Sequence, residues 1–175
     1  HLSLRRQRQM CIRDRRIGYQ NRPHLFTREI ILPELLYCRV LEIDERIAAD
    51  GSVIKPLNEQ SARSCLQAAF DAGLRSVAIV LMHADRYGMA HEARLAQIAQ
   101  EVGFKQISVS HRVSPLVRLI GRGDTTVVDA YLTPVLRTYV EQLSAALPGV
   151  RLSFMQSNGG LTAAARFQGK DAILS

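Results

Sequence analysis

The sequence predicts an α/β fold in which helices flank a mostly parallel sheet. One observation is the continuous apolar run VAIVLM at 77–82, which has the length of a strand. Such runs are typical of parallel strands that helices cover on both faces. A second observation is the order of elements between residues 53 and 110, which reads strand, helix, strand, helix, strand. With 175 residues and 47% hydrophobic content, the chain is long enough to bury a core.

The first predicted elements are a hairpin and a helix. Residues 37–45 alternate apolar and polar side chains, which is the period of a half-buried strand. The Asp-Gly pair at 50–51 favours a tight turn, and residues 53–55 would form the returning strand. Asn58 suits the N-cap of the next helix, and Gly73 is placed to end that helix in the left-handed conformation.

The later elements repeat the alternation of helix and strand. We expect a helix over 89–102, a strand over 106–110, a long amphipathic helix over 124–147 and a last strand over 151–156. Pro134 should kink the long helix or split it in two. The side chains that this helix is expected to bury are Val128, Leu132, Val135, Leu136, Tyr139, Val140, Leu143 and Leu147.

The net charge of +7 is concentrated at the N-terminus. Residues 1–16 hold six Arg and one Asp, a net +5, which leaves +2 for the other 159 residues. An Arg-rich arm can bind phosphate backbones, but the rest of the chain offers few aromatic or basic side chains for nucleic acid. The string RQRQMCIRDR resembles translated sequencing-adaptor read-through. We therefore expect 1–16 to be a non-native or disordered arm, and no nucleic-acid partner.

The cysteines and the motif inventory exclude several classes of protein. Three cysteines without metal-ligand spacing are typical of reduced thiols, which indicates a cytoplasmic protein. No apolar run approaches the roughly 18 residues of a membrane span. The chain contains no Walker loop, GxSxG elbow or CxxC pair. It also lacks HxxxH and HExxH spacing, so we expect no metal site within it.

Polar side chains follow three of the predicted strands. His83 follows the strand at 77–82, His111 follows the strand at 106–110, and the Ser-Asn-Gly-Gly turn at 157–160 follows the last strand. If the three strands are parallel neighbours, these groups share one edge of the sheet, where α/β proteins bind ligands. The paired glycines could let backbone N–H groups approach an anion. The alternative, an ordinary tight turn, is the more common use of Gly-Gly.

Other polar residues admit plainer interpretations. His83 could act as a ligand or proton carrier or be purely structural, and a structural hydrogen bond is favoured for His111. His91 and Glu92 could also be ligands or proton carriers. His91 is more typical of an exposed helix start, and Glu92 in the same turn complements the helix dipole. Asp124 can cap the long helix, although a helix N-terminus can also face an anionic ligand.

Read as whole strings, several stretches resemble consecutive blocks of the hydantoinase A/5-oxoprolinase family. The resemblance runs in unbroken order from IGYQNRPHLF at 17–26 to FMQSNGGLTAAARFQGKDAILS at 154–175. The blocks at 123–131 and 155–161 are the most specific. RGDTTVVDAYL is most similar to the form found in 5-oxoprolinases and hydantoin-hydrolysing enzymes, with acetone carboxylase subunits further off.

The resemblance implies a partial actin-like, ribonuclease-H-like ATPase fold. After the arm at 1–16, residues 17–118 would be the C-terminal part of the family's N-terminal domain. Residues 119–175 would be the truncated start of the hydantoinase A domain. The family's phosphate-binding Asp-x-Gly-Gly-Thr pattern is absent. We therefore expect an internal piece of a longer protein that by itself neither binds ATP tightly nor hydrolyses it.

The resemblance also implies a reaction. It is ATP-dependent opening of a cyclic amide, most specifically 5-oxo-L-proline to L-glutamate, with hydantoin or N-methylhydantoin as alternative substrates. ATP and Mg²⁺ would be required, since phosphorylating the amide oxygen makes a poor electrophile reactive. A hydantoinase B-type subunit or fused B domain would be the partner, in an oligomer. A non-catalytic scaffold is the alternative from another class. The residues expected near substrate or nucleotide are Ser157, Asn158, Gly159, Gly160, His83 and Asp124.

Overall fold

The computed structural model describes residues 35–172. The chain divides into two units, His1–Glu42 and Ile43–Ser175. The predicted arm at 1–16 lies outside the described residues. In the part of the first unit that is described, 35–42, no helix or strand is assigned. All elements below belong to the second unit.

A short hairpin opens the second unit. β1 (Arg46–Ile47) pairs antiparallel with β2 (Val53–Lys55) across the predicted Asp-Gly turn. Asp50 stabilises this turn by accepting hydrogen bonds from the backbone N (2.9 Å) and hydroxyl (2.7 Å) of Ser52. The strand predicted over 37–45 is wrong in position, because a ladder needs a partner and β2 offers only three residues.

Helix α2 (Glu59–Asp71) confirms the predicted cap and stop. The side chain of Asn58 accepts a hydrogen bond from the backbone N of Ser61 (3.0 Å), as an N-cap does. Gly73 has φ +93°, which most other residues tolerate poorly. The buried positions Ala62, Leu66 and Ala69 form the inward stripe of the helix.

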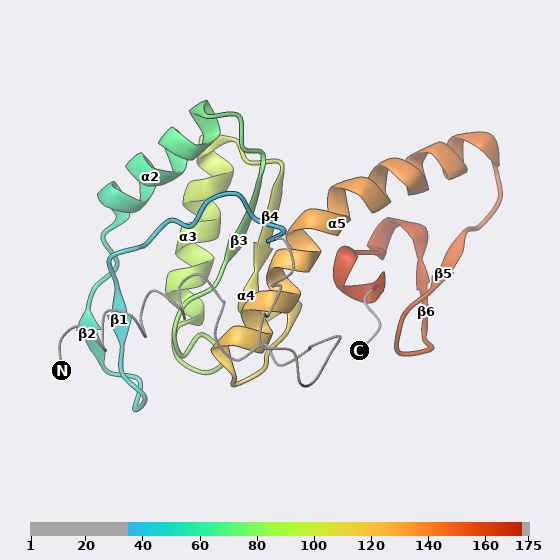
Figure 1. Ribbon diagram of the computed structural model, residues 1–175. Coiled ribbons are helices and arrows are strands. Elements are labelled where there is room, and N and C mark those ends of the chain that lie inside the picture. Colours follow the sequence, from blue (N-terminus) through green and yellow to red (C-terminus); the bar gives the residue numbers. More distant parts are fainter. Residues whose placement is uncertain (1–34, 173–175) are drawn as a thin grey trace, which may run out of the picture. The chain divides into compact units, whose positions relative to one another are not determined.

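Two parallel strands and the helix between them form the centre of the unit. β3 (Ser76–Ile79) and β4 (Gln106–Val109) pair in parallel, and α3 (Met89–Val102) connects them. Gly103 ends α3 with φ +111°. Figure 1 shows α3 and α5 on opposite sides of the β3–β4 pair, and both helices contact both strands. The predicted α/β arrangement, with helices on both faces of a parallel pair, is confirmed.

The two faces of β3–β4 differ in chemistry. On the face toward α2 and α3, Ala62, Ile79 and Leu95 form an apolar cluster, with Ile107 of β4 packed against it. Ser108 follows Ile107 and therefore points to the opposite face. There it donates to Asp129 of α5.

Helix α5 (Leu119–Ala146) corrects two predictions. It follows the four-residue helix α4 (Ser110–Val113) and begins five residues earlier than expected, and Pro134 does not split it. Val135, Tyr139 and Leu147, expected to be buried, are 61%, 53% and 42% exposed, whereas Val140 is buried as expected. Instead the helix buries a mainly polar stripe: Arg122, Gly123, Thr126, Asp129, Ala130, Thr133 and Val140. The partners of those polar groups, described below, decide which side faces inward.

The last elements form a separate hairpin. β5 (Ser153–Met155) pairs antiparallel with β6 (Leu161–Ala163), in a sheet of their own. Two 3₁₀ turns follow, η1 (Ala164–Arg166) and η2 (Gly169–Ala172), and η2 packs on α5. The shared edge expected for three parallel strands is therefore wrong for β5. Within residues 35–172, no helix is both long and apolar enough to cross a membrane.

Candidate functional site at the carboxyl edge of the parallel strands

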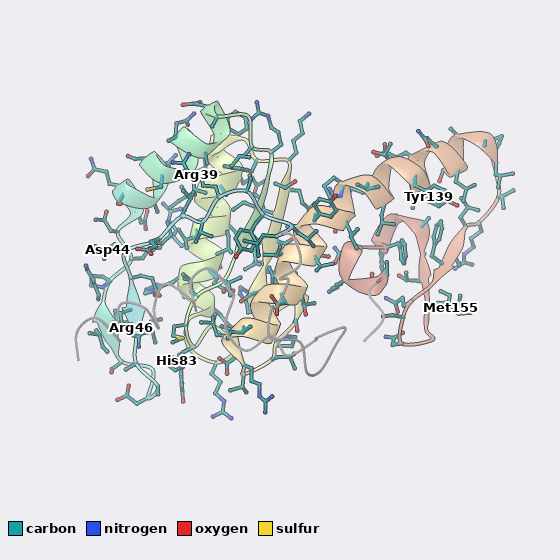
Figure 2. All side chains as sticks on the ribbon, in the orientation of Figure 1. Arg39, Asp44, Arg46, His83, Tyr139 and Met155 are labelled. Carbon is teal, nitrogen blue, oxygen red and sulfur yellow. The ribbon has the colours of Figure 1, made fainter. Side chains whose placement is uncertain are left out.

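The carboxyl ends of β3 and β4 lie at one edge because the two strands are parallel. His83 comes from the loop after β3, and Figure 2 shows it at the end of the unit where α3 begins. Its φ of +55° is unusual for a residue other than glycine. The carbonyl of His83 accepts hydrogen bonds from the backbone N of Arg86 (3.2 Å), Tyr87 (2.9 Å) and Gly88 (2.9 Å), and these hold the loop tightly wound.

Glu92, in the first turn of α3, joins the ends of both strands. Its side chain is fully buried. Oε1 accepts from the backbone N of Leu81 (2.8 Å) and from the hydroxyl of Ser110 (2.6 Å). Oε2 accepts from the backbone N of His111 (3.1 Å) and lies 2.7 Å from its Nδ1. One carboxylate thus holds the residues that follow β3 and β4.

Arg122 reaches the same edge from α5. Its guanidinium is fully buried and donates to the carbonyls of Leu81 and Leu116 and to Oδ1 of Asp85 (3.2 Å). The backbone N–H of Leu81 therefore donates to Glu92, and its carbonyl accepts from Arg122. Nε of Arg122 is buried without a partner among the described residues.

A second buried network connects β4, α5 and η2. Asp129 accepts from the hydroxyl of Ser108 (2.6 Å), from the hydroxyl of Thr133 (3.2 Å) and from the backbone N of Lys170 (2.8 Å). The hydroxyl of Thr133 accepts from the backbone N of Gly169 (2.9 Å). These bonds fix the rotation of α5 against the sheet.

The turn at 157–160 lies at the tip of the β5–β6 hairpin, away from the β3–β4 ladder. Gly159, with φ +82°, donates its N–H to Gln156, and the N–H of Gly160 is held by Oδ1 of Asn158 (2.8 Å). The N–H of Ser157 is bound to the carbonyl of Asp171 (2.8 Å). Three of the four N–H groups are thus already used. As described, the turn does not fit a phosphate cradle.

Asp124 lies in the second turn of α5 and does not cap the helix. The N-cap is Arg118, with no side-chain capping bond, so the predicted capping role is wrong. The prediction for His91 also needs correction. Its ring is only 17% exposed and lies 2.7 Å from Oε2 of Glu45.

Sequence reasoning missed Glu92 and Asp129. A signal was available, because Glu92 shares a helical face with Leu95 and Ala99, at spacings of three and seven. Similarly, Asp129 shares a face with Thr126 and Thr133. A polar residue on the inward stripe of a helix indicates a buried hydrogen-bond partner. For His111, the expected structural hydrogen bond is present.

The described residues do not form a metal site by themselves. Across 35–172, no group of three or more His, Cys, Asp or Glu side chains is placed to hold a metal ion. What the edge provides is an imidazole held by a buried carboxylate.

Models of two protein families match this chain. The model described as hydantoinase/oxoprolinase N-terminal region matches residues 9–103, and the model described as hydantoinase/oxoprolinase matches residues 122–175. The chain belongs to the hydantoinase/oxoprolinase family. β3, α3 and Glu92 lie within the range matched by the N-terminal model, and Arg122 and Asp129 lie within the range matched by the second model.

Individual members of the hydantoinase/oxoprolinase family align with almost the whole chain. 5-Oxoprolinase 1 of Arabidopsis thaliana is 36% identical over 182 residues, and 5-oxoprolinase of Saccharomyces cerevisiae is 34% identical over 189 residues. Each alignment covers 91% of this chain. The chain spans only 14% and 15%, respectively, of the length of those relatives.

A solved structure agrees with the fold of this hydantoinase/oxoprolinase chain. The crystal structure of ATP-dependent caprolactamase from Pseudomonas jessenii superposes with a TM-score of 0.79 at 25% sequence identity. The superposition covers 91% of this chain and 24% of that one. The caprolactamase subunit alpha of the same organism is 28% identical over 152 residues, which is 83% of this chain and 22% of the subunit.

Proposed function

We propose that this chain is part of an ATP-dependent hydrolase that opens a cyclic amide, with 5-oxo-L-proline as the substrate and L-glutamate as the product. The observation that carries the proposal is the alignment of 91% of the chain with two 5-oxoprolinases at 34–36% identity. A caprolactamase shares the fold of the same residues. Oxoproline and caprolactam differ in ring size but share the bond that is broken, a ring amide.

Energetics explain why such an enzyme would use ATP. An amide carbonyl is a poor electrophile, and phosphorylation of its oxygen produces an activated centre that water can attack. Positioned donors and Mg²⁺ would stabilise the phosphates in the complete protein. We propose that the nucleotide-binding residues lie outside the described part of the chain, because three of the four backbone N–H groups at 157–160 already form hydrogen bonds within it.

Substrate choice is tested with the complete enzyme and a panel of cyclic amides. We expect 5-oxoproline to stimulate ADP release and to yield L-glutamate, both followed by coupled assay and mass spectrometry. If the enzyme preferred hydantoin or N-methylhydantoin, the assigned substrate would change but the reaction class, ATP-dependent opening of a cyclic amide, would stand. If no cyclic amide stimulates ATP hydrolysis above background, the proposed function is wrong.

The 175-residue chain alone is proposed to be inactive. Calorimetry should detect no tight ATP binding, and the chain should release no ADP in response to 5-oxoproline. Oxoproline-dependent ATP turnover by this chain would contradict the proposal directly.

We also propose a hydantoinase B-type partner, as a separate subunit or a fused domain, and an oligomeric cytoplasmic enzyme. The name of one relative, caprolactamase subunit alpha, supports a partner polypeptide. Co-expression of the complete protein with a B-type polypeptide, followed by light scattering, should give one complex. If the two polypeptides instead eluted as two species on size-exclusion chromatography, a B-type subunit that binds as a separate polypeptide would be contradicted.

A further inference from the structure

Glu92 and His111 form a buried carboxylate–imidazole pair whose geometry goes beyond capping. Burial of a carboxylate is costly unless it is fully hydrogen-bonded, and Glu92 meets that demand with four donors. Three of them, two backbone N–H groups and a hydroxyl, could be served by a neutral oxygen. The fourth, His111 Nδ1 at 2.7 Å, forms a charge-assisted bond when Glu92 is ionised.

The pairing determines which ring nitrogen carries the proton. An ionised carboxylate only accepts hydrogen bonds, so Nδ1 of His111 must donate. In the neutral ring, Nε2 then keeps its lone pair. Among residues 35–172, the hydrogen bonds of the His111 ring use Nδ1 and not Nε2, and the His111 side chain retains 12% of its surface exposed while Glu92 retains 0%. Within the described part of the chain, Nε2 thus belongs to a ring that is held through its other nitrogen, Nδ1.

We propose that Glu92 is a positioning residue that locks His111 in the Nδ1–H form, so that Nε2 accepts the proton of the water that attacks the ring carbonyl. The inference rests on the proposed function for the identity of the reaction. In this step a water O–H bond breaks and its proton moves to Nε2. The water oxygen bonds to the former carbonyl carbon of the O-phosphorylated amide, and the π pair of its C=N bond moves to the ring nitrogen. Glu92 stabilises the imidazolium that results.

The strained loop after β3 supports an active edge here. His83 holds a positive φ beside the same strand end, and such backbone strain concentrates at functional sites. Leu81 connects that loop to the pair, because its N–H binds Glu92. The carboxylate therefore positions both the His83 loop and the His111 ring.

The tautomer can be measured in the 175-residue chain by long-range ¹H–¹⁵N correlation of the histidine rings, at a pH where the imidazole is neutral. The signal of His111 is assigned among the five histidines with His111→Gln. We expect a pyridine-like Nε2 and a pyrrole-like Nδ1. A pyrrole-like Nε2 in the unsubstituted chain would overturn the inference.

Substitution separates positioning from packing. Glu92→Gln should shift the tautomer of His111 toward Nε2–H. If that variant does not fold, Glu92→Asp serves instead, since its shorter side chain keeps the charge but withdraws it from Nδ1. The matched control is Glu45→Gln, which removes a carboxylate at the same 2.7 Å from His91. It should alter His91 and leave the His111 signal unchanged.

Kinetics of the complete enzyme provide the second readout. Glu92→Gln should lower kcat for 5-oxoproline by about 100-fold or more, the scale of general-base catalysis. KM should stay within about threefold, since an interaction used only in the transition state is lost. Glu45→Gln should leave both parameters near their starting values. If Glu92→Gln instead raised KM by about 100-fold and left kcat unchanged, the positioning role would be wrong.

The two readouts distinguish failure of this inference from failure of the proposed function. If His111 shows the Nδ1–H form but no cyclic amide is turned over, the proposed function fails and with it the assigned step. If 5-oxoproline is turned over but His111 carries its proton on Nε2, the function stands and the role of Glu92 is wrong.

Discussion

The two faces of the β3–β4 pair are packed by different kinds of interaction. Toward α3, Ile79, Leu95 and Ala62 exclude water by apolar contact, which has no directional requirement. Toward α5, Ser108 and Asp129 are joined by a hydrogen bond of 2.6 Å. The stability of the apolar face therefore depends on the volume that its side chains fill, whereas that of the polar face depends on the pairing of each group with a specific partner.

The largest effect is expected at Arg122. Arg122→Ala leaves Asp85 and two carbonyls without their donor, and breaking a buried pair costs about 3–5 kcal/mol. Urea unfolding of the 175-residue chain measures the loss. Arg122→Lys should not restore stability, because an ammonium lacks the planar fork. Arg137→Ala, at an exposed position of the same helix, is the control and should change stability by no more than about 0.5 kcal/mol. Equal losses for Arg122→Ala and Arg137→Ala would contradict the pairing argument.

On the apolar face, Leu95→Ala should remove about 2–5 kcal/mol through lost contacts and a cavity. Leu95→Met keeps the volume and should cost less than about 1.5 kcal/mol. The same unfolding assay applies. If Leu95→Met keeps most of the free energy of unfolding while Arg122→Lys does not, the two faces differ as argued. If Leu95→Met is as unstable as Leu95→Ala, the argument from volume is wrong.

A smaller effect is expected where η2 packs on α5. A Cβ at Gly169 would lie 2.9 Å from the carbonyl oxygen and 3.0 Å from the Cα of Asp129. Gly169→Ala should therefore cost about 1–3 kcal/mol by overpacking. Gly121→Ala is the matched control on α5, with no atom within 4 Å of the new methyl. It should stabilise the helix by about 0.5–1 kcal/mol. Thermal unfolding that shows both variants shifted in the same direction would contradict this contact.

The smallest effect is expected among exposed charges, which neither face uses. The hydrogen bond from Arg94 (2.6 Å) lowers the pKa of Glu59 below its ordinary 4.5. A depressed folded-state pKa adds stability above the unfolded pKa, and this stability is lost as pH falls through the folded pKa. Arg94→Ala should raise the pKa of Glu59, as NMR titration of the carboxyl carbon would show. The pKa of Glu101 is lowered mainly by its hydrogen bond from Arg63, so it should change less when Arg94 is replaced. Added salt should weaken both effects.

Local signals predicted much of the fold. The helix N-cap at Asn58 and the stop at Gly103 depend on neighbours in sequence, and both are confirmed. Of the strand predicted over 77–82, only 77–79 lie in β3. The length of the first strand and the start of α5 were predicted less well. Both depend on cross-strand or long-range hydrogen bonds, which local patterns do not encode.

The candidate site was predicted only in part. His83 and His111 were expected at the ends of β3 and β4, and they lie there. The turn at 157–160 was expected at the same edge, but β5 pairs with β6 instead. A strand's own residues indicate that it pairs, not with which strand, because any exposed backbone edge offers the same donors and acceptors. Glu92 was interpreted as complementing the helix dipole, and its burial was not predicted because its four donors come from positions 81, 110 and 111.

The sequence by itself determined the family, the helix and strand alternation around VAIVLM, and the apolar face of β3–β4. These follow from short-range spacing and from area buried, which any inward-facing hydrophobic stripe supplies. Only the tertiary structure decided that α5 turns Arg122 and Asp129 inward while Val135 and Tyr139 face outward. It also decided that Glu92 holds His111. Buried polar groups are stable only beside partners, and several of these partners are distant in sequence: 19 residues for Glu92 and His111, 21 for Asp129 and Ser108, and 41 for Arg122 and Leu81.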